Sequence, residues 1–193
     1  MKEVIILGRG PTMIDCPYDA EVWAVNDGYL TSKRIDKLFL TDVWSEFSVD
    51  DLNDAKAKFG CEIIASCPSL DGLAVTLYPI EEILQKFKTR FFTNTICYMI
   101  AYALHKGYKR IRLYGVDMMT HTAYIHEKGG VEFWMGVALG MGVEVFNTKG
   151  SATGKTITGK LYGEWGDRTE KIGELLRGIQ AENHGNTGGK SWQ

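Results

Sequence analysis

The sequence lacks several features that would assign it to a specialised class of protein. None of its apolar runs approaches the length that spans a bilayer, and charged Lys2 and Glu3 stand where a secretory signal would begin. Its 22 basic and 24 acidic residues give a formal net charge of −2, so no broad positive field attracts nucleic acid or an anionic membrane. These absences predict a cytoplasmic protein that holds a small-molecule ligand at a local site.

Cysteine is scarce and shows no motif. The four cysteines have none of the close spacings of metal or redox sites, and 193 residues with 45% hydrophobic side chains can bury a core without disulfides. We therefore expect reduced, structural thiols. We also expect one nucleotide-binding domain over residues 1–182, followed by a polar, glycine-rich and flexible tail over residues 183–193.

Short apolar runs separated by turns recur along the chain and are typical of buried strands. Helical patterns lie between the later runs, over residues 94–107 and 131–141, and another follows over 168–182. This alternation predicts an α/β fold: a single Rossmann-like domain with a mostly parallel sheet of about six strands and helices on both faces. The predicted strands are Val4 to Leu7, Val22 to Val25, Leu38 to Leu40, Glu62 to Ala65, Ile111 to Tyr114 and Val143 to Phe146.

The turn after the first strand is the leading candidate for ligand binding. Gly8 and Gly10 let a ligand approach the backbone, and Pro11 favours a helical turn whose free N–H groups attract anions. Arg9 adds a cation and Thr12 a hydroxyl donor. The third glycine of the dinucleotide-binding fingerprint is missing, so a plain strand-to-helix connection explains the same residues equally well.

Polar residues also follow the second and third strands. Asn26 offers a donor and an acceptor suited to a base or ribose, while Asp27 and Asp42 can accept hydrogen bonds from sugar hydroxyls. Asx-turn chemistry favours the same residue types at strand ends. Because the carboxyl ends of parallel strands share one edge of the sheet, we expect these side chains to line one cleft.

The second half of the chain adds further candidates at that edge. Asn94 and Thr95 can cap a helix or bind an anion, and Gly115 and Asp117 end a strand. In the expected loop over residues 117–127, His126 is the candidate general base and Asp117 is the second candidate catalytic residue. The spacing of the histidines does not fit a metal site, so no metal and no cofactor are expected. Accessory candidates are Tyr124, Glu132 and Lys155.

Taken in order, these segments resemble the small bacterial sialyltransferase-like family, which uses cytidine-monophosphate sugars, and related phage proteins of unestablished role. The likeness lies in the first strand and its turn, in Asn26, and in residues 93–117 with Gly107-Tyr108-Lys109 and Gly115-Val116-Asp117. Asn94-Thr95 departs from the Ser-Gly of that family. The resemblance implies a nucleotide-sugar site built on Gly8 to Thr12, Asn26 and Asn94, with His126 as base.

The sequence therefore favours a phage-encoded glycosyltransferase-like protein that moves a sugar from a nucleotide donor to a hydroxyl acceptor. One alternative is a phage protein that sequesters a nucleotide-derived signal or a modified nucleotide without catalysis. Another is Mg-dependent pyrophosphoryl transfer, because the fold also resembles pterin pyrophosphokinase-like domains; it would use Asp27, Asp42 or Asp117. Trp165 and Tyr162 are candidates for packing in a homo-oligomer.

Overall fold

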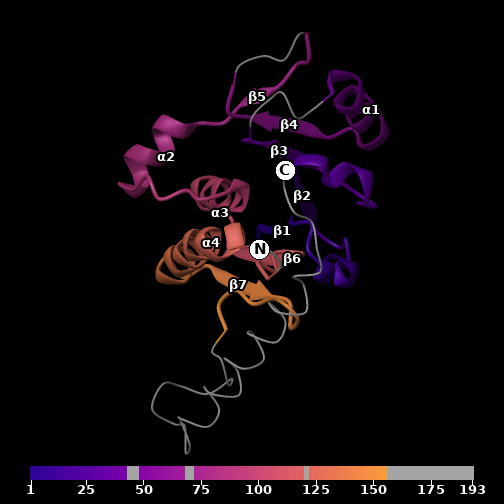
Figure 1. Ribbon diagram of the computed structural model, residues 1–193. Coiled ribbons are helices and arrows are strands. Elements are labelled where there is room, and N and C mark those ends of the chain that lie inside the picture. The colour runs from indigo at the N-terminus through magenta and orange to yellow at the C-terminus, as the bar shows by residue number, and fades with distance from the viewer. Residues whose placement is uncertain (43–47, 68–71, 120–121, 156–193) are drawn as a thin grey trace, which may run out of the picture. The chain divides into compact units, whose positions relative to one another are not determined.

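The strands form one fully parallel sheet. The computed structural model describes residues 1–42, 48–67, 72–119 and 122–155, and for residues 122–125 the backbone alone. Within this part the sheet has seven strands in the order β5-β4-β3-β2-β1-β6-β7 (Figure 1). Their bounds are β1 Glu3–Leu7, β2 Glu21–Val25, β3 Lys37–Leu40, β4 Glu62–Ala65, β5 Thr76–Leu77, β6 Arg110–Tyr114 and β7 Glu144–Asn147.

The predicted α/β class and the parallel sheet are confirmed, with one strand more than expected. The extra strand, β5, has only two residues, both exposed, so it carries no apolar run that a sequence pattern could detect. The helices are α1 Val49–Phe59, α2 Ile80–Phe87, α3 Thr95–His105 and α4 Thr122–Gly140, with short 3-10 helices η1 Pro11–Asp15 and η2 Asn26–Leu30.

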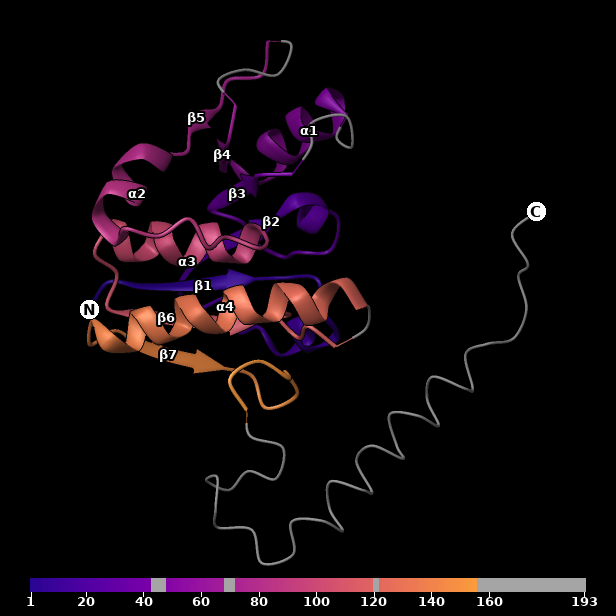
Figure 2. The ribbon, with the colours of Figure 1, turned by 60° about the vertical axis from the view of Figure 1, so that its left-hand side comes forward.

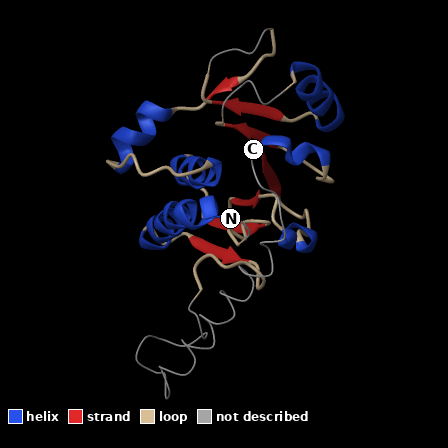
Figure 3. Cartoon of the chain, viewed as in Figure 1, coloured by secondary structure: helices blue, strands red, loops and turns tan. Residues whose placement is uncertain are grey.

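Helices cover both faces of the sheet (Figure 3). Alternate residues of a strand point to opposite faces, so Val4 and Ile6 of β1 belong to the apolar cluster under α2, α3 and α4. Ile5 and Leu7 pack instead with residues around η1, and α1 covers β3 and β4 on that same face. In Figure 2, α3 and α4 lie side by side across β1.

Aromatic packing fixes α3 on the sheet. Trp23 of β2 is fully buried, and its ring lies 5.3 Å from Phe39, 5.4 Å from Tyr102 of α3 and 5.0 Å from Tyr108, between ring centroids. Such tilted and edge-to-face pairs are favourable beyond the area they bury. These contacts hold the C-terminal half of α3 against β2 and β3.

The sheet has a topological switch point between β1 and β6. From β1 the chain adds β2, β3, β4 and β5 in turn on one side, then returns through α2 and α3 to place β6 on the other side. Because the connections leave these neighbouring strands in opposite directions, a crevice opens at their carboxyl ends, where open α/β sheets bind ligands.

Helix α4 begins nine residues earlier than the predicted start at residue 131. The expected loop over residues 117–127 is therefore wrong in its second half, and His126 lies on a helix. Adjacent Gly129 and Gly130 read as helix breakers. Glycine is needed at position 130, because a Cβ there would lie 2.1 Å from Oγ1 of Thr93. The missing side chain lets α4 pack closely against the segment before α3.

The chain divides into two compact units, Met1–Gly154 and Lys155–Gln193. Only Lys155 of the second unit is described. Five predictions lie outside the described residues and stay predictions. They are the helix over residues 168–182, the domain end at residue 182, the tail over 183–193, and the packing roles of Tyr162 and Trp165. Among the helices that the structure describes, none has the length and apolar character needed to cross a membrane.

Candidate functional site

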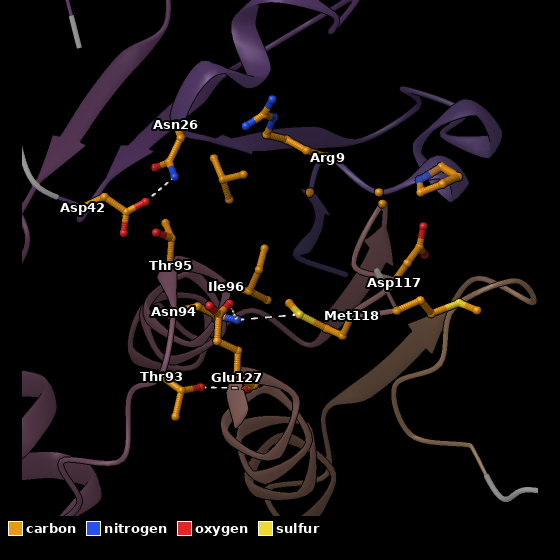
Figure 4. A pocket seen from close by; sticks show the side chains of 16 residues that line it. Arg9, Asn26, Asp42, Thr93, Asn94, Thr95, Ile96, Asp117, Met118 and Glu127 are labelled. Atoms are coloured by element: carbon orange, nitrogen blue, oxygen red, sulfur yellow. Dashed lines mark hydrogen bonds between the residues drawn. The ribbon is translucent and has the colours of Figure 1, made fainter. Parts of the chain in front are cut away.

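A cavity of about 450 Å³ lies at the switch point (Figure 4). The carboxyl ends of β1, β2, β3 and β6, the N-terminus of α3 and one side chain of α4 all contribute to its wall. The structure thus brings the turn after β1, Asn26 and Asp117 together around one cavity. The lining residues are Gly8, Arg9, Gly10, Pro11, Val25, Asn26, Asp42, Thr93, Asn94, Thr95, Ile96, Gly115, Asp117, Met118, Met119 and Glu127.

Asp117 holds the turn after β1 in place. Its Oδ2 accepts a hydrogen bond from the backbone N–H of Thr12 at 2.9 Å, and its Oδ1 accepts one from the Thr12 hydroxyl. The same hydroxyl oxygen accepts from the N–H of Gly115 at 3.0 Å. Asp117 is buried, so these bonds compensate the cost of removing its charge from water. Both carboxylate oxygens take part in this clamp.

The backbone of that turn is already hydrogen-bonded. The N–H of Gly8 donates to the carbonyl of Tyr114 at 2.8 Å, that of Gly10 donates to the carbonyl of Gly115 at 2.7 Å, and that of Thr12 donates to Asp117. The prediction of free N–H groups in the helical turn after Pro11 is therefore wrong for Thr12, and the amides of Gly8 and Gly10 are bonded as well. The acceptors come from Tyr114 at the end of β6 and from Gly115 and Asp117 after it.

The glycines of the turn serve close packing against β6. A Cβ on Gly8 would lie 2.3 Å from the carbonyl oxygen of Gly115, and a Cβ on Gly10 would lie 2.4 Å from Oδ2 of Asp117. Gly115 itself has a φ of +66°, a left-handed conformation that favours glycine. The glycine pattern read from the sequence thus reflects the contact of two strand ends as well as access to the cavity.

The segment after β7 supports the same wall. The Thr148 hydroxyl donates to Oγ1 of Thr12 at 2.9 Å, the Ser151 hydroxyl donates to the carbonyl of Val116 at 2.8 Å, and the N–H of Ala152 donates to the carbonyl of Asp117 at 3.1 Å. This glycine-rich stretch superficially resembles a phosphate-binding loop. In the structure these three hydrogen bonds hold the turn after β1 and the residues that follow β6 in place.

The N-terminus of α3 presents unbonded amides to the cavity. Asn94 caps the helix, because its Oδ1 accepts from the N–H of Cys97 at 3.2 Å. The N–H groups of Thr95 and Ile96 precede the first hydrogen bond of the helix and donate to none of the described residues. Both residues line the cavity, so the positive end of the helix dipole faces it.

Glu127 of α4 contacts this helix start. Its Oε2 accepts from Nδ2 of Asn94 at 3.1 Å, and its backbone carbonyl accepts from the Thr93 hydroxyl at 2.8 Å. Figure 4 shows the Glu127 side chain beneath Asn94, on the side of Met118. The two hydrogen bonds join the start of α3 to the first half of α4.

The opposite wall carries the amide and carboxylate expected after β2 and β3. Nδ2 of Asn26 donates to Oδ2 of Asp42, and Oδ1 of Asn26 is buried without a hydrogen-bond partner in the described part of the chain. Asn26 has a φ of +47°, which asparagine adopts more readily than most residues. Nearby, the Thr41 and Thr95 hydroxyls lie 2.8 Å apart and link this wall to α3.

Arg9 is the cation of the cavity wall. Its Nε lies 2.9 Å from Oδ1 of Asp27, and 61% of its side chain is exposed. Asp27 does not itself line the cavity. The carboxylates of Asp27, Asp42 and Asp117 thus pair with three different neighbours, and no group of three His, Cys, Asp or Glu residues within the described ranges is placed to hold a metal ion. These positions add no support for the pyrophosphoryl-transfer alternative.

Two predicted residues, His126 and Glu132, are not part of the cavity wall. His126 is exposed on α4, and Glu132, further along that helix, accepts from the N–H of Gly154 at 2.8 Å. The structure describes only the backbone of Tyr124, and Lys155 is the first residue of the second unit, so the roles of both stay predictions. Thr12 does not line the cavity, but its N–H and hydroxyl hold the side chain of Asp117, which does.

The cavity also has members that the sequence reading missed. Thr93 and Ile96 flank the predicted Asn94 and Thr95, and Met118 follows Asp117, so their neighbours signalled them. Glu127 was missed because the segment was read as a loop. The helical phase of α4, which turns adjacent residues about 100° apart, is the signal that would have separated Glu127 from His126.

Comparisons with known proteins identify the fold. The sequence matches no family model, and no curated protein matches it. The sialyltransferase CstII from Campylobacter jejuni with cytidine-5'-monophosphate gives a TM-score of 0.55 at 17% identity, covering 92% of this chain and 100% of that one. Its complex with the substrate analogue CMP-3FNeuAc gives 0.54 at 18%, covering 76% and 80%. The complex of CST-II with a trisaccharide acceptor and CMP gives 0.53 at 18%, with the same coverage. The chain therefore shares the fold of these sialyltransferase structures.

Proposed function

We propose that this protein binds a nucleotide sugar in the cavity at the switch point and transfers the sugar to a hydroxyl acceptor. The observation that carries the proposal is the position of the cavity, where Asn26, the turn after β1 and the N-terminus of α3 converge. The neighbours that share this fold were solved with CMP or a CMP-sugar analogue. Phage origin stays a prediction from the sequence.

The available hydrogen-bond donors orient the ligand. The phosphate is assigned to the amides of Thr95 and Ile96, because the amides of Gly8, Gly10 and Thr12 are occupied. A helix N-terminus with free N–H groups favours an anion through both hydrogen bonds and the dipole. The base and ribose then lie toward Asn26 and Asp42, whose oxygens accept hydrogen bonds from amino and hydroxyl groups.

Calorimetric titration with CMP, UMP, AMP and GMP tests the binding half of the proposal. A ligand that binds only the folded state also raises the melting temperature, by an amount that grows with ligand concentration. We expect saturable binding of CMP with one site per chain. The absence of binding and of any thermal shift across the four nucleotides would contradict the proposal.

Binding without turnover is the second candidate, and one observation favours it. All three carboxylates in the wall, Asp42, Asp117 and Glu127, already accept hydrogen bonds from neighbouring side chains, and His126 is not part of the wall. Incubation with CMP-N-acetylneuraminic acid separates the candidates. A transferase releases CMP catalytically, whereas a sequestering protein binds the donor stoichiometrically and leaves it intact.

A further inference from the structure

We propose that Glu127 is the general base of this site, in the place for which the sequence suggested His126. The inference rests on the proposed transferase function. Glu127 lines the cavity and His126 does not, because adjacent residues of α4 point in different directions. A general base must come within hydrogen-bond reach of the hydroxyl that it deprotonates, and only a group in the wall satisfies this requirement.

Elimination among the carboxylates of the wall leads to the same residue. Asp117 uses both oxygens to hold Thr12 and is buried. Asp42 pairs with Asn26 on the wall assigned to the base and ribose. Glu127 uses Oε2 to accept from Asn94, and its Oε1 makes no hydrogen bond to any described residue. One oxygen of Glu127 is thus held in position while the other remains able to take a proton.

The location of Glu127 fits the reacting end of a donor. The side chain contacts Asn94, the residue immediately before the amides to which the phosphate is assigned. The bond that breaks joins this phosphate to the anomeric carbon of the sugar, so the reacting carbon lies next to the start of α3. Asn94 anchors the carboxylate there, and the hydrogen bond from Thr93 to the Glu127 carbonyl fixes its backbone.

The transfer step balances with this assignment. The acceptor oxygen forms a bond to the anomeric carbon while its proton passes to Oε1 of Glu127. The bond between the anomeric carbon and the phosphate oxygen breaks, and its electron pair leaves with the nucleoside monophosphate. The proton on Glu127 then returns to solvent, which regenerates the carboxylate.

Glu127→Gln is the direct test, because the amide keeps an oxygen that can accept from Asn94 and loses only the basic group. Purified full-length protein is given CMP-N-acetylneuraminic acid with water and with lactose as acceptors, and CMP release is followed. We expect turnover to fall about 10²–10⁴-fold. CMP affinity, measured by calorimetry, stays within about threefold or tightens, because a negative charge near the phosphate is removed. Glu81→Gln, an exposed carboxylate of α2, is the matched control and keeps wild-type turnover.

Each other outcome overturns the assignment in a distinguishable way. Turnover by Glu127→Gln within threefold of wild type removes Glu127 as the base, and so does a large loss in His126→Gln alone. Parallel losses of CMP affinity and turnover in Glu127→Gln show that the residue acts only by positioning Asn94. Wild-type protein that binds CMP and releases none from the donor overturns this inference and favours sequestration, whereas failure to bind CMP overturns the proposed function itself.

Discussion

At the scale of single residues, the cavity depends on how closely β1 approaches β6. Gly8→Ala would place a Cβ 2.3 Å from the carbonyl oxygen of Gly115. Both residues directly follow the last ladder pair, Leu7 and Tyr114, so this backbone atom cannot yield as a flexible side chain does. We expect a loss of about 1–3 kcal/mol in the free energy of unfolding, measured by urea denaturation.

Gly136→Ala is the matched control for this prediction. Gly136 lies within α4, and a Cβ there meets nothing within 4 Å. Alanine is the better helix former, so this variant gains about 0.5–1 kcal/mol. Equal stabilities for the two variants would show that the strand ends can separate without cost, and the close approach of Gly8 and Gly115 would lose its structural role.

At the scale of elements, the start of α3 is where capping and ligand binding coincide. Asn94→Ala removes the cap on Cys97 and leaves Glu127 without its hydrogen-bond partner, so we expect a loss of about 0.5–2 kcal/mol in stability. We also expect CMP binding to weaken at least tenfold, because the amides of Thr95 and Ile96 are no longer held in place. Urea denaturation and calorimetry measure the two effects.

Ser48→Ala provides the comparison, since Ser48 caps α1, which covers β3 and β4 on the face opposite α3. This variant is expected to lose stability through its missing cap and to keep its CMP affinity. If the two cap variants weakened CMP binding equally, the effect would come from general destabilisation and the start of α3 would have no special part in the site.

At the same scale, the sequence predicts where the strands end but not how their polar groups pair. The strands after which Gly8, Asn26, Asp42 and Asp117 stand have strong apolar runs, and a parallel sheet brings their ends together whatever the details of the loops. The pairing of each donor with its acceptor is a tertiary property. No local pattern indicates that the end of β6 and the residues after it accept hydrogen bonds from the amides of the turn after β1. The glycine pair in α4 hid the helix that carries Glu127.

At the scale of the whole molecule, His105 links folding to pH. Burial lowers the pKa of His105, the charges of Lys106 and Lys86 act in the same direction, and Glu82, 3.3 Å away, acts against them. The pKa in the folded state is therefore below the ordinary value of 6.5. The unfolded chain takes up the proton first as pH falls, so the stability contributed by neutral His105 is complete above about pH 6.5 and is lost progressively below it.

His105→Gln tests this linkage by keeping a neutral polar side chain that cannot be protonated. We expect the urea midpoint of the wild-type protein to fall more steeply between pH 7 and pH 5 than that of the variant. Carboxylates titrate in both proteins and cancel in the comparison. Parallel midpoints across this range would mean that His105 has the same proton affinity in the folded and unfolded chain.

The central claim is that the cavity between β1 and β6 binds the phosphate of a nucleotide at the first amides of α3. A crystal structure of the protein with CMP measures this directly. The account predicts phosphate oxygens at about 2.7–3.2 Å from the backbone nitrogens of Thr95 and Ile96, with the cytidine toward Asn26. CMP bound outside this cavity, or with its phosphate on the turn from Gly8 to Thr12 and away from α3, would contradict it.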